Sequence, residues 1–369
     1  MRCISKKTKT MRTGFTTGAC SAAAARAAIV GLLSDRAPEH VECLLPNGQQ
    51  VYFAVTDAVV DDRQGERCTR AVVVKDAGDD PDCTHGARLT AEARPLPGLP
   101  GEIRIEGGDG VGVVTLPGLG LDVGKPAINP TPRRNIRDNA RLAAGSFLDR
   151  EGLLLTISVP GQAMAKKTLN ARLGILGGIS ILGATGIVHP WSTAAFRASV
   201  VQGIEVAAAQ GQNVIVLTTG GRTERFAMEE LSHLAPVCFV QMGDFLRPAL
   251  DTVVEQGISH VVIGAMVGKL AKMAQGETIT HANRNPVDMH GLAEIAVMAG
   301  APVAARDAIR EGRTARYAGE RMDALGLGEI FHHALARRVV ETLAGRYPGR
   351  FTLQVLVCDF EGRKITEVV

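Results

Sequence analysis

Aromatic side chains are scarce in this chain of 369 residues, at 4% of the sequence with a single tryptophan. A protein that stacks many nucleic-acid bases needs more rings than this. The chain also lacks an excess of either charge, since 41 basic and 38 acidic residues leave a net charge of +3. Near balance gives no broad basic face, so we expect no nucleic-acid partner.

Paired cysteines and metal-ligand spacings are absent as well. The seven cysteines are scattered singly, their number is odd, and no Cys-x-x-Cys occurs. This usage is typical of a reducing cytoplasm and not of a disulfide framework. His281 and His290 have no cysteine or carboxylate at zinc-like spacing, so we expect no protein metal site.

Long apolar runs are the third absence. The first 20 residues carry no apolar signal core before Ala19, and no run reaches the roughly 18 residues of a membrane span. We therefore expect a soluble cytoplasmic protein with no membrane contact. The length is sufficient for a large core and for two domains. The sequence leaves open whether the chain forms a homo-oligomer.

Glycine, in contrast, is abundant and concentrates in one apolar segment, residues 166–195. Five glycines between positions 174 and 186 are too many for a stable helix interior. Glycine allows backbone to approach backbone or ligand closely. The segment is either a buried connection that lines a cavity or a tightly packed crossover between domains.

The first half predicts an α+β domain over residues 1–165. A Gly/Thr loop with Thr13, Thr16 and Thr17 runs into an alanine-rich helix over 18–34. Such a loop is either a polar-ligand site at a helix N-terminus or a cap with a small-residue packing face. A second helix is predicted at 134–147. Strands are predicted at 40–45, 50–59, 67–75, 89–94, 102–106, 111–116 and 153–159, with hairpins at Asn47-Gly48 and at 107–110.

Two charged stretches interrupt this half. Four aspartates within residues 76–82 lack the spacing of a calcium loop, so a solvated polar turn is favoured over a cation site. A proline-rich loop at 129–132 leads into Arg133, Arg134 and Arg137. Arginines near a helix start suit the bidentate capture of carboxylates, although a plain basic surface cluster gives the same pattern.

The second half predicts an α/β Rossmann-like domain over residues 166–369, with its core at about 190–300. Apolar strands at 213–218, 237–242 and 260–266 alternate with helices at 193–210, 223–231 and 246–256, and another helix begins at 268. Uniformly apolar strands between amphipathic helices indicate a mainly parallel sheet covered on both faces. Further helices are predicted at 287–299 and 327–343, and a terminal strand at 351–358.

Ligands of such sheets bind at the carboxyl ends of the strands. Gly220-Gly221, Asp244 and the segment 264–269 occupy these ends. The last resembles a P-loop, but it is one residue short and has Leu270 where a magnesium-binding hydroxyl belongs, which excludes triphosphate hydrolysis. Asp244 either accepts hydrogen bonds from a ribose or an ammonium group, or caps the following helix.

Five stretches match one known family in order: RTGFTTGAC (12–20), DAGDDPD (76–82), IEGGDGVGVVTLPGLGLDVGKPAINPTPR (105–133), AKKTLNARLGILGGISILGATGIVHPWS (165–192) and VGKLAKMAQGETITHA (267–282). The chain therefore resembles the CbiD family, the cobalt-precorrin-5B C1-methyltransferases of oxygen-independent cobalamin synthesis. The resemblance implies methyl transfer from S-adenosylmethionine to C1 of the corrinoid, giving cobalt-precorrin-6A. Cobalt then belongs to the substrate. Many members have Gly-His where this chain has Gly264-Ala265, so no role of that histidine carries over.

The implied chemistry needs a sulfonium cofactor at the strand ends and a polycarboxylate corrinoid in a cleft against the first domain. No general base is identified. Two rivals stay open, a non-catalytic corrinoid carrier or scaffold and an NAD-dependent tetrapyrrole reductase, although the dinucleotide-binding glycine motif is missing. The expected cofactor residues are Gly220, Gly221, Asp244, Gly264 and Gly268. The expected corrinoid residues are Thr13, Thr16, Thr17, Arg133, Arg134, Lys166, Lys167, Arg172 and Lys269.

Overall fold

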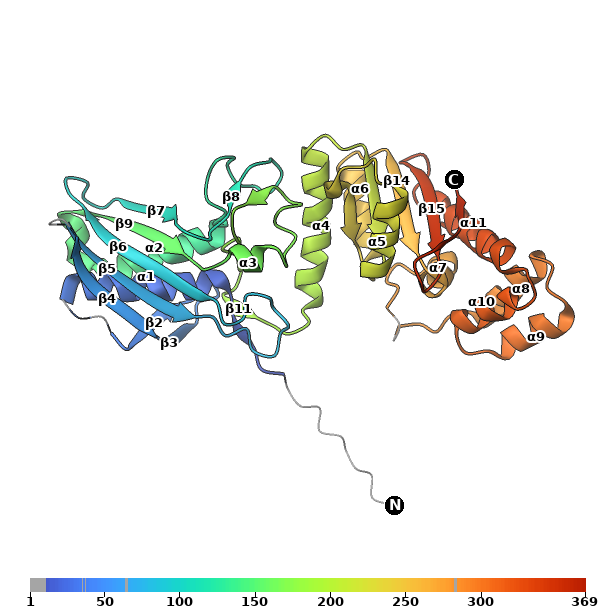
Figure 1. Ribbon diagram of the computed structural model, residues 1–369, viewed down its shortest axis with the longest axis horizontal. Helices are drawn as coiled ribbons and strands as arrows, with labels where there is room; N and C mark the ends of the chain where they lie inside the picture. Colours follow the sequence, from blue (N-terminus) through green and yellow to red (C-terminus); the bar gives the residue numbers. More distant parts are fainter. Residues whose placement is uncertain (1–10, 35, 37, 64–65, 282–283) are drawn as a thin grey trace, which may run out of the picture. The chain divides into compact units, whose positions relative to one another are not determined.

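The computed structural model describes residues 11–34, 36, 38–63, 66–281 and 284–369 (Figure 1). It divides into two compact units, of which unit 1 ends at Ser192 and unit 2 runs from Thr193 to Val369. Residues 166–192, which we expected to open the second domain, lie in unit 1. Both units combine helices with sheets. Each unit has one five-stranded sheet, which contains both parallel and antiparallel strand pairs.

Unit 1 is built on a five-stranded sheet. All its neighbouring strands are antiparallel except for the last pair, β9 and β7. The late strand β9 inserts between β6 and β7, so the middle of the sheet joins segments far apart in the chain. The strand order is β4 (Asp57–Arg63), β5 (Glu66–Val74), β6 (Arg88–Leu96), β9 (Gly152–Ser158) and β7 (Ile103–Gly107).

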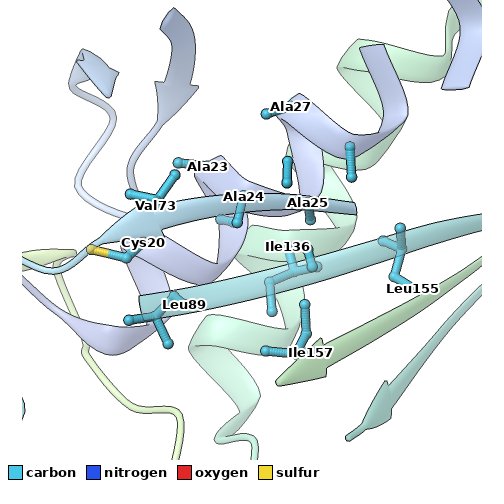
Figure 2. Close-up of a cluster of buried hydrophobic side chains, with 14 of the residues drawn as sticks. Cys20, Ala23, Ala24, Ala25, Ala27, Val73, Leu89, Ile136, Leu155 and Ile157 are labelled. Carbon is cyan, nitrogen blue, oxygen red and sulfur yellow. The ribbon is translucent and has the colours of Figure 1, made fainter. Parts of the chain in front are cut away.

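The core of unit 1 forms around helix α1 (Thr17–Ser34). Its alanines lie among side chains of β5, β6, β9 and helix α2 (Pro130–Ala144), as Figure 2 shows. Because alanine is small, the helix can pack closely on all sides. Only four of its 18 residues are not buried, and all four lie in its second half. We expected no stretch of membrane-span length, yet α1 meets that criterion by length and composition. Its burial inside the unit is that of a core helix.

Short strand pairs complete unit 1. Strands β2 (His40–Leu44) and β3 (Gln50–Ala54) form the hairpin predicted at Asn47-Gly48, where Gly48 has a φ of 85°. The second predicted hairpin, at 107–110, is wrong. Its two arms separate, since β7 pairs with β9 while β8 (Val113–Val114) pairs with β10 (Ile175–Leu176). Strand β1 (Gly14–Phe15) pairs with β11 (Ile187–Val188).

The glycine-rich segment packs within unit 1. A Cβ added at Gly178 would lie 2.1 Å from the carbonyl oxygen of Gly110, and one at Gly183 would lie 2.3 Å from Thr16 Oγ1. Such contacts are far below any real Cβ distance, so only glycine fits there. At these positions the glycines serve close packing inside one unit.

Unit 2 has a second five-stranded sheet, of order β13-β12-β14-β15-β16. The predicted parallel pairing is confirmed for its first four strands, and β16 is antiparallel to β15. The strands are β12 (Val214–Thr218), β13 (Phe239–Gln241), β14 (His260–Ala265), β15 (Thr352–Cys358) and β16 (Lys364–Val368). The helices include α4 (Thr193–Ala209), α5 (Gly221–Glu230), α6 (Leu246–Glu255), α7 (Val267–Ala274), α8 (Met289–Met298), α9 (Val303–Glu311), α10 (Ala315–Asp323) and α11 (Gly328–Arg346).

The strand order places a reversal between β12 and β14. From β12 the chain passes through α5 to β13 on one side, whereas from β14 it passes on to β15 on the other side. The connections therefore leave these two neighbouring strands in opposite directions. In open parallel sheets the crevice at such a point, outside the carboxyl ends of the strands, is where ligands bind.

Candidate functional site

The turn after β12 lies at this reversal and carries Gly220 and Gly221. Thr223 Oγ1 accepts hydrogen bonds from the backbone N–H groups of Thr219 and Gly220, both at 3.1 Å, and donates to the Gly220 carbonyl at 2.8 Å. The side chain of Thr223 thus holds the turn. A Cβ at either glycine would meet no atom within 4 Å, so the backbone faces open space.

Asp244 follows β13 and forms an ion pair with Lys269 of α7. Its Oδ1 also lies 3.3 Å from the hydroxyl of Thr280, which donates to it, and Lys269 donates to the Thr280 carbonyl at 2.9 Å. No donor to Asp244 Oδ2 is present among the described residues. The side chain does not cap α6, whose first turn has Phe245 at the capping position and no side-chain cap.

The remaining two predicted cofactor glycines differ from each other. Gly268, in the first turn of α7, is exposed, and a Cβ there would meet nothing within 4 Å. Gly264 is buried, and its Cβ would lie 3.3 Å from the Thr218 side chain and 3.5 Å from the Thr223 carbonyl. Gly264 therefore supports the packing of α5 on the sheet, while Gly268 faces open space.

Lys272 is a residue of this region that the sequence analysis did not single out. It is buried, and its Nζ donates to the carbonyls of His281 at 2.5 Å and Arg284 at 2.8 Å. Lys269 and Lys272 are three residues apart on α7, so both reach the segment that follows the helix. The spacing of three residues between the two lysines is visible in the sequence, and it could have indicated that Lys272 acts beside Lys269.

The Gly/Thr loop of unit 1 is held mainly by its own hydroxyls. Thr16 Oγ1 accepts from the backbone N–H of Ala19 at 3.2 Å and so caps α1. Thr17 Oγ1 accepts from the backbone N–H of Leu182 at 2.9 Å and ties the helix start to the glycine-rich segment. Thr13 is exposed. These contacts fit the capping interpretation for Thr16 and Thr17.

The loop packs against the aspartate turn at 76–82. A Cβ at Gly14 would lie 2.0 Å from the backbone carbon of Ala77. We expect Gly14→Ala to lower the free energy of unfolding by about 1–3 kcal/mol, because the backbone must move apart to admit the methyl group. Urea unfolding measures this. Gly345→Ala, where the added Cβ meets nothing within 4 Å, is the matched control and should cost nothing.

The aspartates themselves bind basic groups of the chain. Arg12 pairs with Asp76, and the buried Lys75 donates to Asp82 at 2.6 Å. Burial alone would raise the pKa of Asp82, but the hydrogen bonds from Lys75 and Thr84 outweigh it and lower that pKa. Within the described ranges no three acidic, His or Cys side chains are arranged to hold a metal ion.

The Arg12–Asp76 pair gives a pH-dependent stability. The hydrogen bond from Arg12 lowers the pKa of Asp76 to about 2, from 3.8. The pair therefore stabilises the fold above pH 4, and this contribution is lost as the pH falls from about 4 towards 2. Both side chains are half-exposed, so solvent screens the pair and its contribution to stability is small.

Urea unfolding of the wild type and Arg12→Met should show a difference at pH 6 that shrinks by about half at pH 3. An equal difference at both pH values would contradict the assignment of the shift to this pair.

A groove of about 780 Å³ lies in unit 1 between β7, the loop over 120–126 and the start of α2. Of the three predicted arginine positions, Arg133 and Arg137 line it, and Arg134 is exposed outside it. Lys166, Lys167 and Arg172 do not line it. The structure thus brings two of the three arginines to a groove, but not Arg134 or the basic residues of the glycine-rich segment.

Thiol nucleophiles are not available at the buried cysteines of the core. Burial raises the pKa of Cys20 and of Cys43 to about 12, and that of Cys358 to about 11. A thiol with such a pKa is protonated at neutral pH and is a poor nucleophile. These three cysteines are therefore poor candidates for a covalent intermediate.

Comparison with known proteins gives consistent matches along the chain. The CbiD family model matches residues 4–190, and the model of the CbiD C-terminal domain matches residues 279–368. A cobalt-precorrin-5B C(1)-methyltransferase of Methylococcus capsulatus is 64% identical over 99% of this chain and 95% of its own length. A cobalt-precorrin-5B C(1)-methyltransferase of Salinispora tropica is 49% identical over 96% of this chain and 91% of its own length.

A solved structure also matches, the cobalamin biosynthesis protein (cbiD) of Archaeoglobus fulgidus. It is 30% identical, the alignment covers 71% of this chain and 79% of that one, and the TM-score is 0.38.

Proposed function

The chain belongs to the CbiD family, and from this premise we propose that it transfers a methyl group from S-adenosylmethionine to C1 of cobalt-precorrin-5B. The observation that carries the proposal is 64% identity to a relative of that name, across nearly the whole of both chains. The chain is then a C-methyltransferase of cobalamin biosynthesis, and its product is cobalt-precorrin-6A. We place it in the oxygen-independent form of the pathway.

We place the cofactor at the carboxyl ends of β12, β13 and β14, in a Rossmann-like domain formed by unit 2. Three features support the fit. The backbone at Gly220, Gly221 and Gly268 borders open space, where a ligand can approach closely. Asp244 Oδ2 lacks a donor among the described residues. Thr218 Oγ1, at the end of β12, is buried and has no hydrogen-bond partner in the described part of the chain.

The chain's own groups act mainly by positioning. S-adenosylmethionine supplies a methyl group already activated on a sulfonium. The protein then needs to hold that methyl group in line with the accepting carbon, and correct orientation alone accounts for a large part of such a rate enhancement. Lys269 and Thr280 fix the Asp244 carboxylate, which leaves Oδ2 to accept a hydrogen bond from a ribose hydroxyl or an ammonium group.

Cofactor binding separates this proposal from its rivals. Calorimetric titration of the full chain with S-adenosylmethionine should give a stoichiometric complex, and titration with NADH should give none. A corrinoid carrier would bind neither, and a reductase would bind NADH. Anaerobic incubation with cobalt-precorrin-5B and S-adenosylmethionine should then raise the mass of the corrinoid by one methyl group. An unchanged mass would contradict the proposal.

A further inference from the structure

The groove in unit 1 combines an apolar floor with a pair of arginines, Arg133 and Arg137. Ile103, Ile105 and Ile128 line it and are buried, so the floor is apolar. Arg133 and Arg137 enter from α2, one helical turn apart. Neither guanidinium forms an ion pair with an acidic side chain of the described residues.

The two arginines are held close together at an electrostatic cost. Arg133 is half-buried, and its Nη1 donates to the Ile105 carbonyl at 3.1 Å. Burial lowers the pKa of Arg133, and the charge of Arg137 lowers it further, while Asp122 partly offsets this. A like-charge pair that forms no ion pair with a carboxylate of the described residues is a site that an anion from outside the chain would stabilise.

Other charges at the groove leave an excess of positive charge. Lys125 and Arg104 line it together with Glu106 and Asp122. Arg104 is paired with Glu102, at 2.6 Å, and so contributes little to ligand binding. The carboxylates of Asp122 and Glu106 disfavour an anionic group beside them, so the arginine side of the groove is the part that suits a carboxylate. The occupant must therefore present carboxylates to the arginines and an apolar body to the isoleucine floor.

We propose that this groove binds the carboxylate side chains at one edge of a tetrapyrrole, with Arg133 and Arg137 as the carboxylate-binding residues. The assignment rests on the proposed function, because a corrinoid with carboxylate side chains is the substrate there. It adds Arg137 and the groove itself to the corrinoid site. It also separates Arg133 from Arg134, which lies outside the groove.

The test uses the full chain and equilibrium dialysis with two stable corrins. Cobyrinic acid carries free carboxylates, and in cobinamide these are amides. Arg133→Met and Arg137→Met should each weaken the binding of cobyrinic acid at least about tenfold, since each removes a charge-assisted contact. Arg141→Met, on the same helix but paired with Asp138, is the control and should bind like the wild type. Cobinamide should bind the wild type more weakly and be insensitive to all three substitutions.

The outcomes separate the two claims. Wild-type affinity for cobyrinic acid in both groove variants would overturn the groove assignment while leaving the proposed function intact. Failure of the wild type to bind either corrin would reject the substrate class, and the groove assignment with it. Arg133→Met also removes the bond to Ile105, so thermal unfolding is measured for each variant. Arg137 makes no such bond among the described residues, and Arg137→Met alone decides the result if Arg133→Met fails to fold.

Discussion

Gly221→Val should reduce the affinity for S-adenosylmethionine about a hundredfold, or ~2.7 kcal/mol. Gly221 follows the turn that Thr223 holds at the end of β12, and the space beyond it is open. A branched side chain would fill the space that we assign to the cofactor. The fold should tolerate the change, since the new Cβ meets no atom within 4 Å.

Calorimetric titration measures this affinity, and thermal unfolding checks the fold. Gly345→Val is the matched control, because Gly345 also borders open space but lies near the end of α11, which leads to the opposite, amino-terminal edge of β15. Its cofactor affinity should equal that of the wild type. An unchanged affinity in Gly221→Val, with the fold intact, would exclude this turn from the cofactor site.

Asp244→Asn should weaken cofactor binding by about 10- to 100-fold, which corresponds to about 1.5–3 kcal/mol for a hydrogen bond to a charged group. Asparagine keeps an oxygen that can accept from Lys269 and Thr280, so the local structure should persist. It replaces the second carboxylate oxygen, Oδ2, by an amide nitrogen that cannot accept. The stability cost should stay below about 1 kcal/mol, as Asp244 and Lys269 are both partly exposed.

The same titration measures the Asp244 effect, with Asp307→Asn as the control. Asp307 is a partly exposed carboxylate on α9 that pairs with Arg306. That control should leave affinity unchanged. If Asp244→Asn binds the cofactor like the wild type, Asp244 serves only to hold Lys269 and Thr280, and the proposed contact from Oδ2 does not exist.

Local patterns predicted the elements whose type is decided by a few consecutive residues. The Asn47-Gly48 turn joins adjacent strands, and it needed only a positive φ at the glycine. The apolar strands of unit 2 were predicted as parallel because continuous apolar runs between helices have few other solutions. In both cases a few consecutive residues contain the deciding information.

Long-range pairing explains why the predicted glycine hairpin was wrong. The glycines at 107–110 have the composition of a hairpin, but the strands on either side pair with β9 and β10, which lie later in the chain. Composition near a turn does not encode a partner so distant in sequence. The helices α9 and α10 and the strand β16 were not predicted either, although β16 pairs with the strand just before it, β15.

In the candidate sites, too, local sequence predicted some features and only the fold showed the others. Asp244 and the exposed glycines could be selected because strand ends are visible in the sequence. Lys269 was expected to bind the corrinoid, and only the fold shows its ion pair with Asp244. The partnership of Arg137 with Arg133 could be read from helical spacing, but the groove also needs β7 and the 120–126 loop, which come from elsewhere in the chain.

The position of the transferred methyl group tests the central claim most directly. The full chain is incubated anaerobically with cobalt-precorrin-5B and S-adenosylmethionine carrying a ¹³C-labelled methyl group, and the corrinoid product is analysed by NMR. We predict a single labelled methyl group, bonded to C1 of the ring. Label at any other carbon, or a corrinoid recovered without label, would contradict the assignment of this chain as a C1-methyltransferase.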